Sequence, residues 1–553
     1  MEPHLVRLIS VVQLQPAGLV HILVLRMCVR LETHDKRNGP QEPEGRTRWE
    51  EHAAVRGGAW MADGTETLIP RMMLARNRFI FLLVLAAVLA VVSLSFQFLH
   101  LIPTTPAIDE RPHGKSRKRA YAYCNIPNRT EQAWEGHSPA DYKLLSVQVM
   151  IRHGDRYPLY AIPNTKRPAI DCTLTPHRKP SHPQLAPFIR HMSQGGQSRW
   201  DAVLGALPRV PSHSMCEMGE LTQTGVVQHL RNGQLLRNTY IKRHKLLPSD
   251  WSGWQLYVES TGKSRTLQSG LALLYGLLPD FDWAKLAVRH QWNTLFCGSS
   301  CECPMRNQYL EEDQRRQYKL RVSDTLLDRT YVDMARTVGL PPRQLRAANP
   351  IDSLLCHFCH NLSFPCTPQG CISLQQFAVI KMQQLEDERD RRRKGLYLRY
   401  ALLASHPFLN RTVARMLRTA QGRREELFAL YSAHDVTVAP LLSALGLAEA
   451  RFPRFAARVV FELWRRPPPQ DKGKGKGKGR GNGGEGGETR GLYVRVLYNG
   501  EDVTFHTTFC RAHDRHSAQP LCPFGNFLSF VRRDMFSVLN ATSYHEACHR
   551  RTI

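Results

Sequence analysis

The sequence predicts an α/β domain whose strands end in polar turns that carry the chemistry. Three apolar runs of strand length, at 145–151, 254–259 and 427–431, are each followed by a turn rich in polar residues. After the second and third runs the chain continues with the apolar spacing of a helix, and strand–turn–helix units are typical of α/β folds. Because ligands bind at the C-terminal edge of such a sheet, we expect the functional residues to lie in these turns.

The first run ends in the most informative turn. Its branched apolar residues alternate with Ser146, Gln148 and Met150, and the chain then changes abruptly to Arg152-His153-Gly154-Asp155-Arg156. Two guanidinium groups beside an imidazole favour an oxyanion such as phosphate, and Gly154 allows backbone to approach closely. A solvated basic turn is the plainer interpretation. Against it, the pattern R-H-G-x-R-x-P is expected by chance on the order of once in thousands of chains of this size.

The second and third turns carry an arginine and a His-Asp pair that could contribute to the same site. The run at 254–259 is followed by Ser260-Thr261-Gly262-Lys263-Ser264-Arg265 and then by helical spacing, which places Arg265 beside free backbone N–H groups at a helix start. The letters TGKS also end a nucleotide-binding P-loop, but the upstream glycine is missing at the required spacing, so we reject that interpretation. The run at 427–431 leads into Ser432-Ala433-His434-Asp435 and a third helical pattern.

Charge and cysteine usage restrict the partners and the compartment. The 553-residue chain has a net charge of +27, which predicts acidic partners such as nucleic acid, anionic lipid headgroups or phosphorylated and acidic glycans. All of the 14 cysteines except Cys28 follow the apolar segment described next. Cysteines and glycosylation sequons together indicate an oxidising secretory lumen and argue against nucleic acid. The predicted glycosylation sites are Asn128, Asn361, Asn410 and Asn540.

An uncharged apolar segment predicts a membrane anchor. Residues 79–96 contain eighteen consecutive uncharged residues, and the segment extends to Ile102, which is long enough to span a bilayer. Arg71, Arg76 and Arg78 precede it, so the positive-inside rule predicts a cytoplasmic N-terminus and a lumenal C-terminal part. A cleaved signal peptide is the alternative. The segment is longer than an ordinary signal sequence core and no clear cleavage site follows, so we expect a single-pass type II signal-anchor.

Composition sets the remaining boundaries. The residues before Met73 show no coherent pattern, and Met73 offers an alternative start. Repeated prolines and charged helical stretches indicate a cap over the core. A Gly/Lys tract, which cannot form a core, joins two predicted strands. The expected parts are an unstructured extension at 1–72, a cytoplasmic tail at 73–78, the transmembrane signal-anchor at 79–102, a solvated stem at 103–123 and a lumenal domain at 124–553, with the cap mainly at 163–215 and 292–395 and a disordered insertion at 467–490.

The cysteines of the expected cap allow two interpretations. Cys301-x-Cys303 and Cys356-x-x-Cys359, with His357 and His360 nearby, would fit a zinc knuckle. A secretory compartment instead favours structural disulfides. The number of cysteines after the anchor is odd, so one thiol is expected to be unpaired or joined to another chain.

The residues RHGDRYP at 152–158 resemble the histidine acid phosphatase branch of the phosphoglycerate-mutase-like superfamily. That family requires a distal His-Asp pair, which is present at His434-Asp435, and the stretch Ser260–Thr266 fits its STxxxRT pattern. The resemblance implies a three-layer α/β/α core around a mixed sheet, with a mostly helical cap. It also implies a phosphoric monoester hydrolase that needs no cofactor and no metal.

The resemblance gives each motif residue a role. His153 is expected to be the nucleophile that forms a phosphohistidine, and neighbouring positive charge favours its neutral form. Asp435 is expected to donate a proton to the leaving alkoxide. Asp155 is the rival proton donor, but its position between two arginines suits a role in orienting them. The expected ligands of the substrate phosphate are Arg152, Arg156, Arg265 and His434.

Longer runs, among them CEMGELTQTGVVQHL and TGKSRTLQSGLALLYG, are similar to Golgi members of this family from roughly Met73 to the C-terminus. The similarity implies removal of the 2-O-phosphate from the linkage-region xylose of proteoglycans, which promotes glycosaminoglycan synthesis. Implied partners are the phosphorylated linkage-region glycan and glycosyltransferases of the same pathway. The alternatives are a broad-specificity acid or inositol-phosphate phosphatase, and a non-catalytic glycan-binding protein. The complete set of motif residues argues against the last.

Overall fold

The fold is known from a computed structural model. It describes Ala87 and residues 118, 120–125, 133–137, 141–195, 200–393, 395–423, 426–447, 452–467, 489–511 and 521–550. The predicted N-terminal extension, cytoplasmic tail, anchor (apart from Ala87) and most of the predicted stem lie outside these residues, as do Asn128 and most of the Gly/Lys insertion. In the described part of the chain, no helix is both long and apolar enough to cross a membrane.

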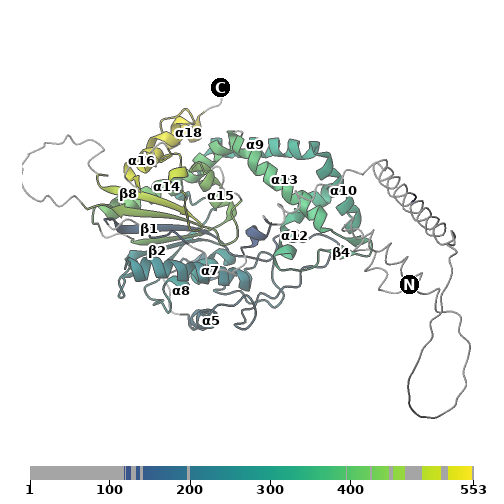
Figure 1. Cartoon of the computed structure of the whole chain (residues 1–553), viewed down its shortest axis with the longest axis horizontal. Helices are drawn as coiled ribbons and strands as arrows, with labels where there is room; N and C mark the ends of the chain where they lie inside the picture. The colour runs from purple at the N-terminus through teal and green to yellow at the C-terminus, as the bar shows by residue number, and fades with distance from the viewer. Residues whose placement is uncertain are drawn as a thin grey trace, which may run out of the picture. The chain divides into compact units, whose positions relative to one another are not determined.

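A mixed sheet of eight strands forms the centre of the fold (Figure 1). The strand order is β10-β8-β7-β1-β6-β2-β3, and β9 pairs with β8. The strands β1, β6, β2 and β3 run parallel to one another. The pairs β1–β7, β7–β8 and β8–β10 are antiparallel. The strands are β1 (Lys143–Arg152), β2 (Leu256–Thr261), β3 (Val288–Gln291), β6 (Phe428–Ala433), β7 (Arg458–Arg465), β8 (Leu492–Tyr498), β9 (Glu501–Asp502) and β10 (Cys522–Pro523).

The three predicted strands are confirmed, with boundaries shifted by one or two residues. The run at 254–259 becomes a strand only at Leu256, because Gly253–Gln255 form the short 3-10 turn η2. Ser252 and Gln255 stabilise that turn, since the backbone N–H of Ser252 donates to Gln255 Oε1 at 2.8 Å. A tight turn at Asn499-Gly500 joins β8 to β9, and both turn residues have a positive φ, 51° and 90°.

Helices cover both faces of the sheet (Figure 1), which confirms the three layers. Val147, Val149 and Ile151 of β1 pack with helices of one layer, whereas Met150 packs with the other. Ser146 and Gln148 are therefore buried as well. The first layer contains α5 (Leu185–Gln194), α7 (Gln223–Leu236) and α8 (Ser264–Leu277); the second contains α14 (Leu396–Ala420), α15 (Asp435–Ala444), α16 (Phe524–Ser529), α17 (Met535–Ser537) and α18 (Tyr544–His549).

A group of helices with its own small core lies beside the sheet (Figure 1). Leu327, Met334, Leu345, Leu354 and Phe377 are among the buried residues that hold it together. The helices of this core are α10 (Thr325–Val338), α11 (Pro342–Ala347), α12 (Pro350–Cys359) and α13 (Leu374–Arg393), with the two-stranded ribbon β4 (Cys366–Thr367) and β5 (Gly370–Cys371). α9 (Pro304–Ser323) precedes them, and its Met305 belongs to the core of the second layer. We call α9–α13 the cap.

The other segment expected in the cap, 163–215, is mostly loop. Its longer helix, α5, packs with α7 and α8 against the sheet through Leu185, Phe188 and Met192.

The remaining short elements of the described chain are α6 (Ala202–Gly205), the π-helical turns η1 (Arg237–Arg243) and η5 (Phe530–Asp534), and the 3-10 turns η3 (Gly298–Cys301) and η4 (Thr504–His506).

Disulfides account for the cysteines of the described residues except Cys356, which is buried and unpaired. Cys301, Cys303 and Cys359, three of the four cysteines of the alternative zinc knuckle, are each bonded to another cysteine, so that interpretation is wrong. The pairs are Cys124–Cys359, Cys172–Cys216, Cys297–Cys301, Cys303–Cys548, Cys366–Cys371 and Cys510–Cys522.

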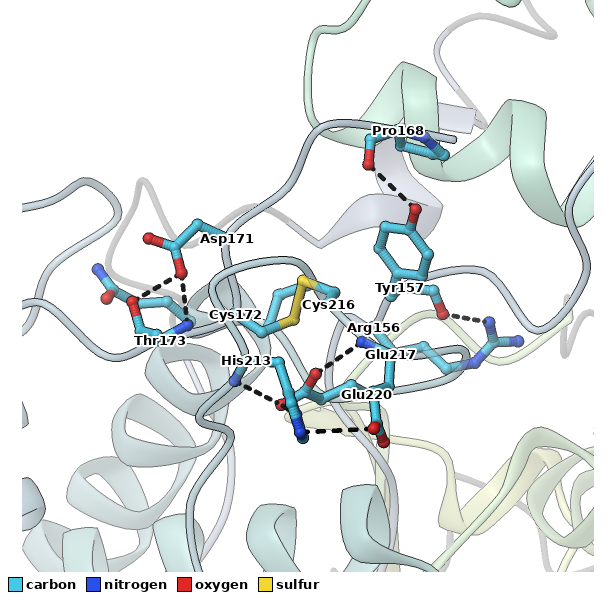
Figure 2. Close-up of a disulfide and its surroundings, with 12 residues drawn as sticks. Arg156, Tyr157, Pro168, Asp171, Cys172, Thr173, His213, Cys216, Glu217 and Glu220 are labelled. Atoms are coloured by element: carbon cyan, nitrogen blue, oxygen red, sulfur yellow. Dashed lines mark hydrogen bonds and ion pairs between the residues drawn. A yellow bond between two sulfur atoms is a disulfide. The ribbon is translucent and has the colours of Figure 1, made fainter. Parts of the chain in front are cut away.

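Figure 2 shows one of these disulfides, Cys172–Cys216, beside Glu220. The two sulfurs and this carboxylate lie close together, as metal ligands do. The sulfurs are bonded to each other, however, and the Glu220 carboxylate accepts backbone N–H groups from Ser212 at 3.0 Å and Glu217 at 2.8 Å. This cluster therefore fixes the loops after β1 and is not a metal site.

Candidate active site

The three polar turns meet at one edge of the sheet, as the sequence predicts. Arg152 at the end of β1 is in register with Ala433 at the end of β6, and Ser260 of β2 is in register with Ser432. The backbone N–H of His153 donates to Ala433 O at 3.0 Å. The rings of His153 and His434 lie 5.6 Å apart between centroids. Parallel neighbours thus bring together residues that are far apart in sequence.

His153 is held in the form of a neutral nucleophile. Its Nδ1 lies 2.8 Å from Gly154 O, which can only accept, so Nδ1 carries the proton and Nε2 keeps its lone pair. Within the described residues, Nε2 has no hydrogen-bond partner. Burial, followed by the charges of Arg152 and Arg265, lowers the pKa of His153 well below its usual value. The imidazole is therefore neutral at physiological pH.

Arg152 is fully buried and fixed by its terminal nitrogens. Nη1 donates to Pro453 O at 2.6 Å, and Nη2 donates to the Tyr123 hydroxyl at 2.8 Å. Nη2 also lies 2.8 Å from Asp435 Oδ2, which makes an ion pair. The guanidinium carbon lies 4.5 Å from the centre of the Phe455 ring. These contacts define the orientation of the planar guanidinium group before any substrate binds.

All three predicted phosphate arginines present an unused donor. In the described part of the structure, Nε of Arg152, Arg156 and Arg265 is buried and has no hydrogen-bond partner. A buried donor left without a partner costs about 1–3 kcal/mol, which a hydrogen bond to a bound oxyanion would recover. Burial, and then the charge of Arg156, lowers the pKa of Arg265 to about 10. Three converging cations with free donors are suited to bind the oxygens of a phosphate.

His434 and Asp435 stand at the start of α15. His434 Nε2 lies 2.8 Å from Thr261 Oγ1, which joins the ends of β6 and β2. Burial, and then the charge of Arg265, lowers the pKa of His434 to about 3, so its ring is neutral. Its role as a phosphate ligand stays a prediction, because the hydrogen bond to Thr261 already engages one ring nitrogen.

Asp435 is ionised in the ligand-free site. Burial raises the pKa of this carboxyl, but the positive charges of Arg152 and Arg156 outweigh that effect and hold it below the usual value. A bound phosphate brings negative charge and competes for Arg152. Both effects favour protonation of Asp435, which a proton donor requires.

Asp155, the rival proton donor, is engaged elsewhere. Its Oδ2 accepts hydrogen bonds from the Thr222 hydroxyl at 2.6 Å and from His360 Nε2 at 2.7 Å. Its backbone N–H donates to Gln228 Oε1 at 2.8 Å. These contacts anchor the turn to α7 and to the end of α12, which supports an orienting role for Asp155.

Two glycines allow α7 to support the turn directly. A Cβ on Gly154 would lie 2.5 Å from Gly225 Cα, and a Cβ on Gly225 would lie 2.3 Å from Asp155 O. Thr222 immediately precedes α7 as its N-terminal capping residue, and its hydroxyl accepts the Gly225 N–H at 3.3 Å. Gly154 therefore serves a close approach of the backbone to α7.

Several residues of the site could not be found from the sequence. Four of them lie outside the motifs and reach the site only through the tertiary structure: Tyr123, Ser269, Asp352 and His360. Ser269, for example, accepts the Gly154 N–H at 3.0 Å. Thr261 alone had a signal, because it lies in the STxxxRT pattern.

Residues 143–499 match the model of the histidine phosphatase superfamily, branch 2. The chain belongs to this superfamily. Among the similar curated histidine phosphatases is "2-phosphoxylose phosphatase 1" of Danio rerio, which is 58% identical over 514 residues, covering 87% of this chain and 100% of that protein. The Homo sapiens protein of the same name is 59% identical over 499 residues, covering 86% of this chain and 99% of that protein.

Among solved structures, a Bifidobacterium longum multiple inositol polyphosphate phosphatase in complex with inositol hexasulfate aligns with a TM-score of 0.47 and 14% identity, covering 75% of this chain and 98% of that chain. Superfamily membership and the closely similar curated phosphatases make this histidine phosphatase a phosphoric monoester hydrolase. The family predicted from RHGDRYP and His434-Asp435 is confirmed.

Proposed function

We propose that this histidine phosphatase removes the 2-O-phosphate from the xylose of the glycosaminoglycan–protein linkage region. The observation that carries the chemistry is the set of three buried arginine Nε donors beside a neutral His153 with a free Nε2. The choice of substrate is supported by relatives more than 55% identical that carry the name 2-phosphoxylose phosphatase 1. Removal of this phosphate would promote chain growth by glycosyltransferases.

The reaction needs two steps. His153 Nε2 attacks phosphorus, the bond from phosphorus to the sugar oxygen breaks, and Asp435 gives its proton to the departing alkoxide. Water then attacks the phosphohistidine, Asp435 takes a proton from it, and inorganic phosphate leaves with the histidine regenerated. Arg152, Arg156 and Arg265 stabilise the negative charge on the phosphoryl oxygens throughout.

A comparison of three substrates tests the proposal. We expect the lumenal protein to hydrolyse a phosphoxylosyl linkage oligosaccharide with a higher kcat/KM than p-nitrophenyl phosphate or phytate. Phosphate release from each substrate, measured side by side, provides the check. A preference for phytate would instead support an inositol-phosphate phosphatase, and equal rates on all three would support a broad-specificity acid phosphatase.

We also propose a Golgi location, with the catalytic domain in the lumen behind an uncleaved type II anchor at 79–102. Six disulfides and the exposed positions of Asn361, Asn410 and Asn540 support a secretory environment. The expected result is a glycosidase-sensitive protein whose C-terminus is protected from protease in sealed microsomes. A cytosolic C-terminus without glycans would contradict both the topology and the substrate.

A further inference from the structure

Helix α12 of the cap and the residue that follows it contact two residues of the RHGDR turn, Asp155 and Arg156. Asp352, in its first turn, accepts hydrogen bonds from Arg156 Nη2 at 2.9 Å and Nη1 at 3.3 Å. The same carboxylate accepts the backbone N–H of Leu159 at 2.6 Å. His360, which follows the last residue of the helix, binds Asp155 Oδ2 at 2.7 Å. One helix, remote in sequence, thus contacts two adjacent residues of the motif.

The same helix is tied to the support of Arg152. Cys359 at its end forms the disulfide with Cys124. The neighbouring Tyr123 accepts the hydrogen bond from Arg152 Nη2 at 2.8 Å. The position of α12 therefore affects two of the three phosphate arginines, Arg156 directly and Arg152 through the disulfide and Tyr123.

Asp352 binds only one of the two edges through which the Arg156 guanidinium group can hold an oxyanion. A guanidinium group can bind an oxyanion in a bidentate manner through its two terminal nitrogens or through Nε and one terminal nitrogen. Asp352 takes the terminal edge of Arg156 and Nη1 also donates to Tyr157 O at 3.0 Å, while Nε has no partner in the described residues. The carboxylate leaves the Nε edge for a second oxyanion.

We propose that Asp352 is a positioning residue of the phosphate site, which holds Arg156 by its terminal edge so that the Nε edge binds the substrate phosphate. The Asp352 side chain is only 17% exposed and that of Arg156 6%, so solvent screens the pair weakly. A carboxylate in the first turn of a helix is further stabilised by the free N–H groups there. The proposal rests on phosphate binding by Arg156 and not on which alcohol carries the phosphate.

Two roles for Asp352 predict opposite changes in phosphate affinity. If the carboxylate only reduced the positive charge of the site, Asp352→Asn would bind inorganic phosphate more tightly. If it positions Arg156, the variant binds phosphate more weakly, because a displaced guanidinium group no longer matches the phosphate oxygens in bidentate geometry. We expect the inhibition constant for inorganic phosphate and the KM for p-nitrophenyl phosphate to rise together by about tenfold or more, with a smaller fall in kcat.

The test uses the full-length protein, with inorganic phosphate and p-nitrophenyl phosphate as probes. Asp328→Asn is the matched control, because Asp328 also pairs with an arginine of the cap, Arg346, at 2.6 Å but is 58% exposed. It should leave both constants unchanged. In an Arg156→Lys background, Asp352→Asn should add little, because the fork that Asp352 holds is gone.

Asp352→Glu keeps the charge but shifts the carboxylate, so its inhibition constant should lie between those of the parent and Asp352→Asn. This variant also provides the measurement if Asp352→Asn does not fold. A folded Asp352→Asn or Asp352→Glu protein that binds phosphate as tightly as the parent, or more tightly, would overturn the positioning role. Because neither probe contains xylose, this outcome is distinguishable from a failure of the glycan assay.

Discussion

Replacing His153 by alanine is expected to abolish hydrolysis of every phosphate ester, whatever its leaving group. The nucleophile is the only group that forms the covalent bond to phosphorus, so its loss removes the phosphohistidine route completely. The neutral imidazole, with Nδ1 bound to Gly154 O and Nε2 without a partner in the described residues, is arranged for this single task. The measurement is turnover of p-nitrophenyl phosphate and of the linkage oligosaccharide, together with trapping of acid-labile phosphate on the protein.

His177→Ala is the control for this experiment, because His177 is exposed and lies in a turn outside the three motifs of the site. It should retain the parent rates and the trapped phosphate. Thermal unfolding separates a chemical loss from a folding defect in the His153 variant. Trapped phosphate on any other residue, or residual turnover of the activated ester by a folded His153→Ala protein, would contradict the mechanism.

The second large effect is expected for Asp435→Asn, and it should depend on the leaving group. A proton donor matters most when the departing oxygen is strongly basic, so the variant should lose roughly 10²–10⁴-fold on xylose 2-phosphate and much less on p-nitrophenyl phosphate. Phosphohistidine should still form from the activated ester. Rates on the two substrates, with quantified acid-labile phosphoprotein, provide the check.

The pH dependence gives the same experiment a second readout. A proton donor is active only when protonated, so the rate on the sugar phosphate should fall as pH rises above the pKa of Asp435 in the substrate complex. Arg152 and Arg156 hold the pKa of Asp435 low in the ligand-free site. The negative charge of a bound phosphate is expected to raise it. Asp435→Asn should lose this part of the profile. An equal loss on both esters, with an unchanged pH profile, would assign the proton to another group.

The sequence by itself determined the chemistry and the local structure. Alternating apolar residues in 145–151 and the helical spacing after 254–259 and 427–431 report local backbone periods of 2 and 3.6, which single segments express without help from the rest of the chain. The motifs around His153, Arg265 and His434 lie directly after these segments. The strand–turn–helix pattern predicted that these motifs lie at the edge of a sheet, and the parallel order of β1, β6 and β2 brings them together there.

The tertiary structure alone decided which atoms are available for chemistry. Asp352 reaches Arg156 across 196 residues and His360 reaches Asp155 across 205, and no local period encodes contacts of that range. The same holds for the Cys124–Cys359 disulfide, which removed the zinc alternative, and for the hydrogen bond between His434 and Thr261. Residue types determine what a group can do, whereas burial and distant partners determine its protonation and which of its atoms remain free.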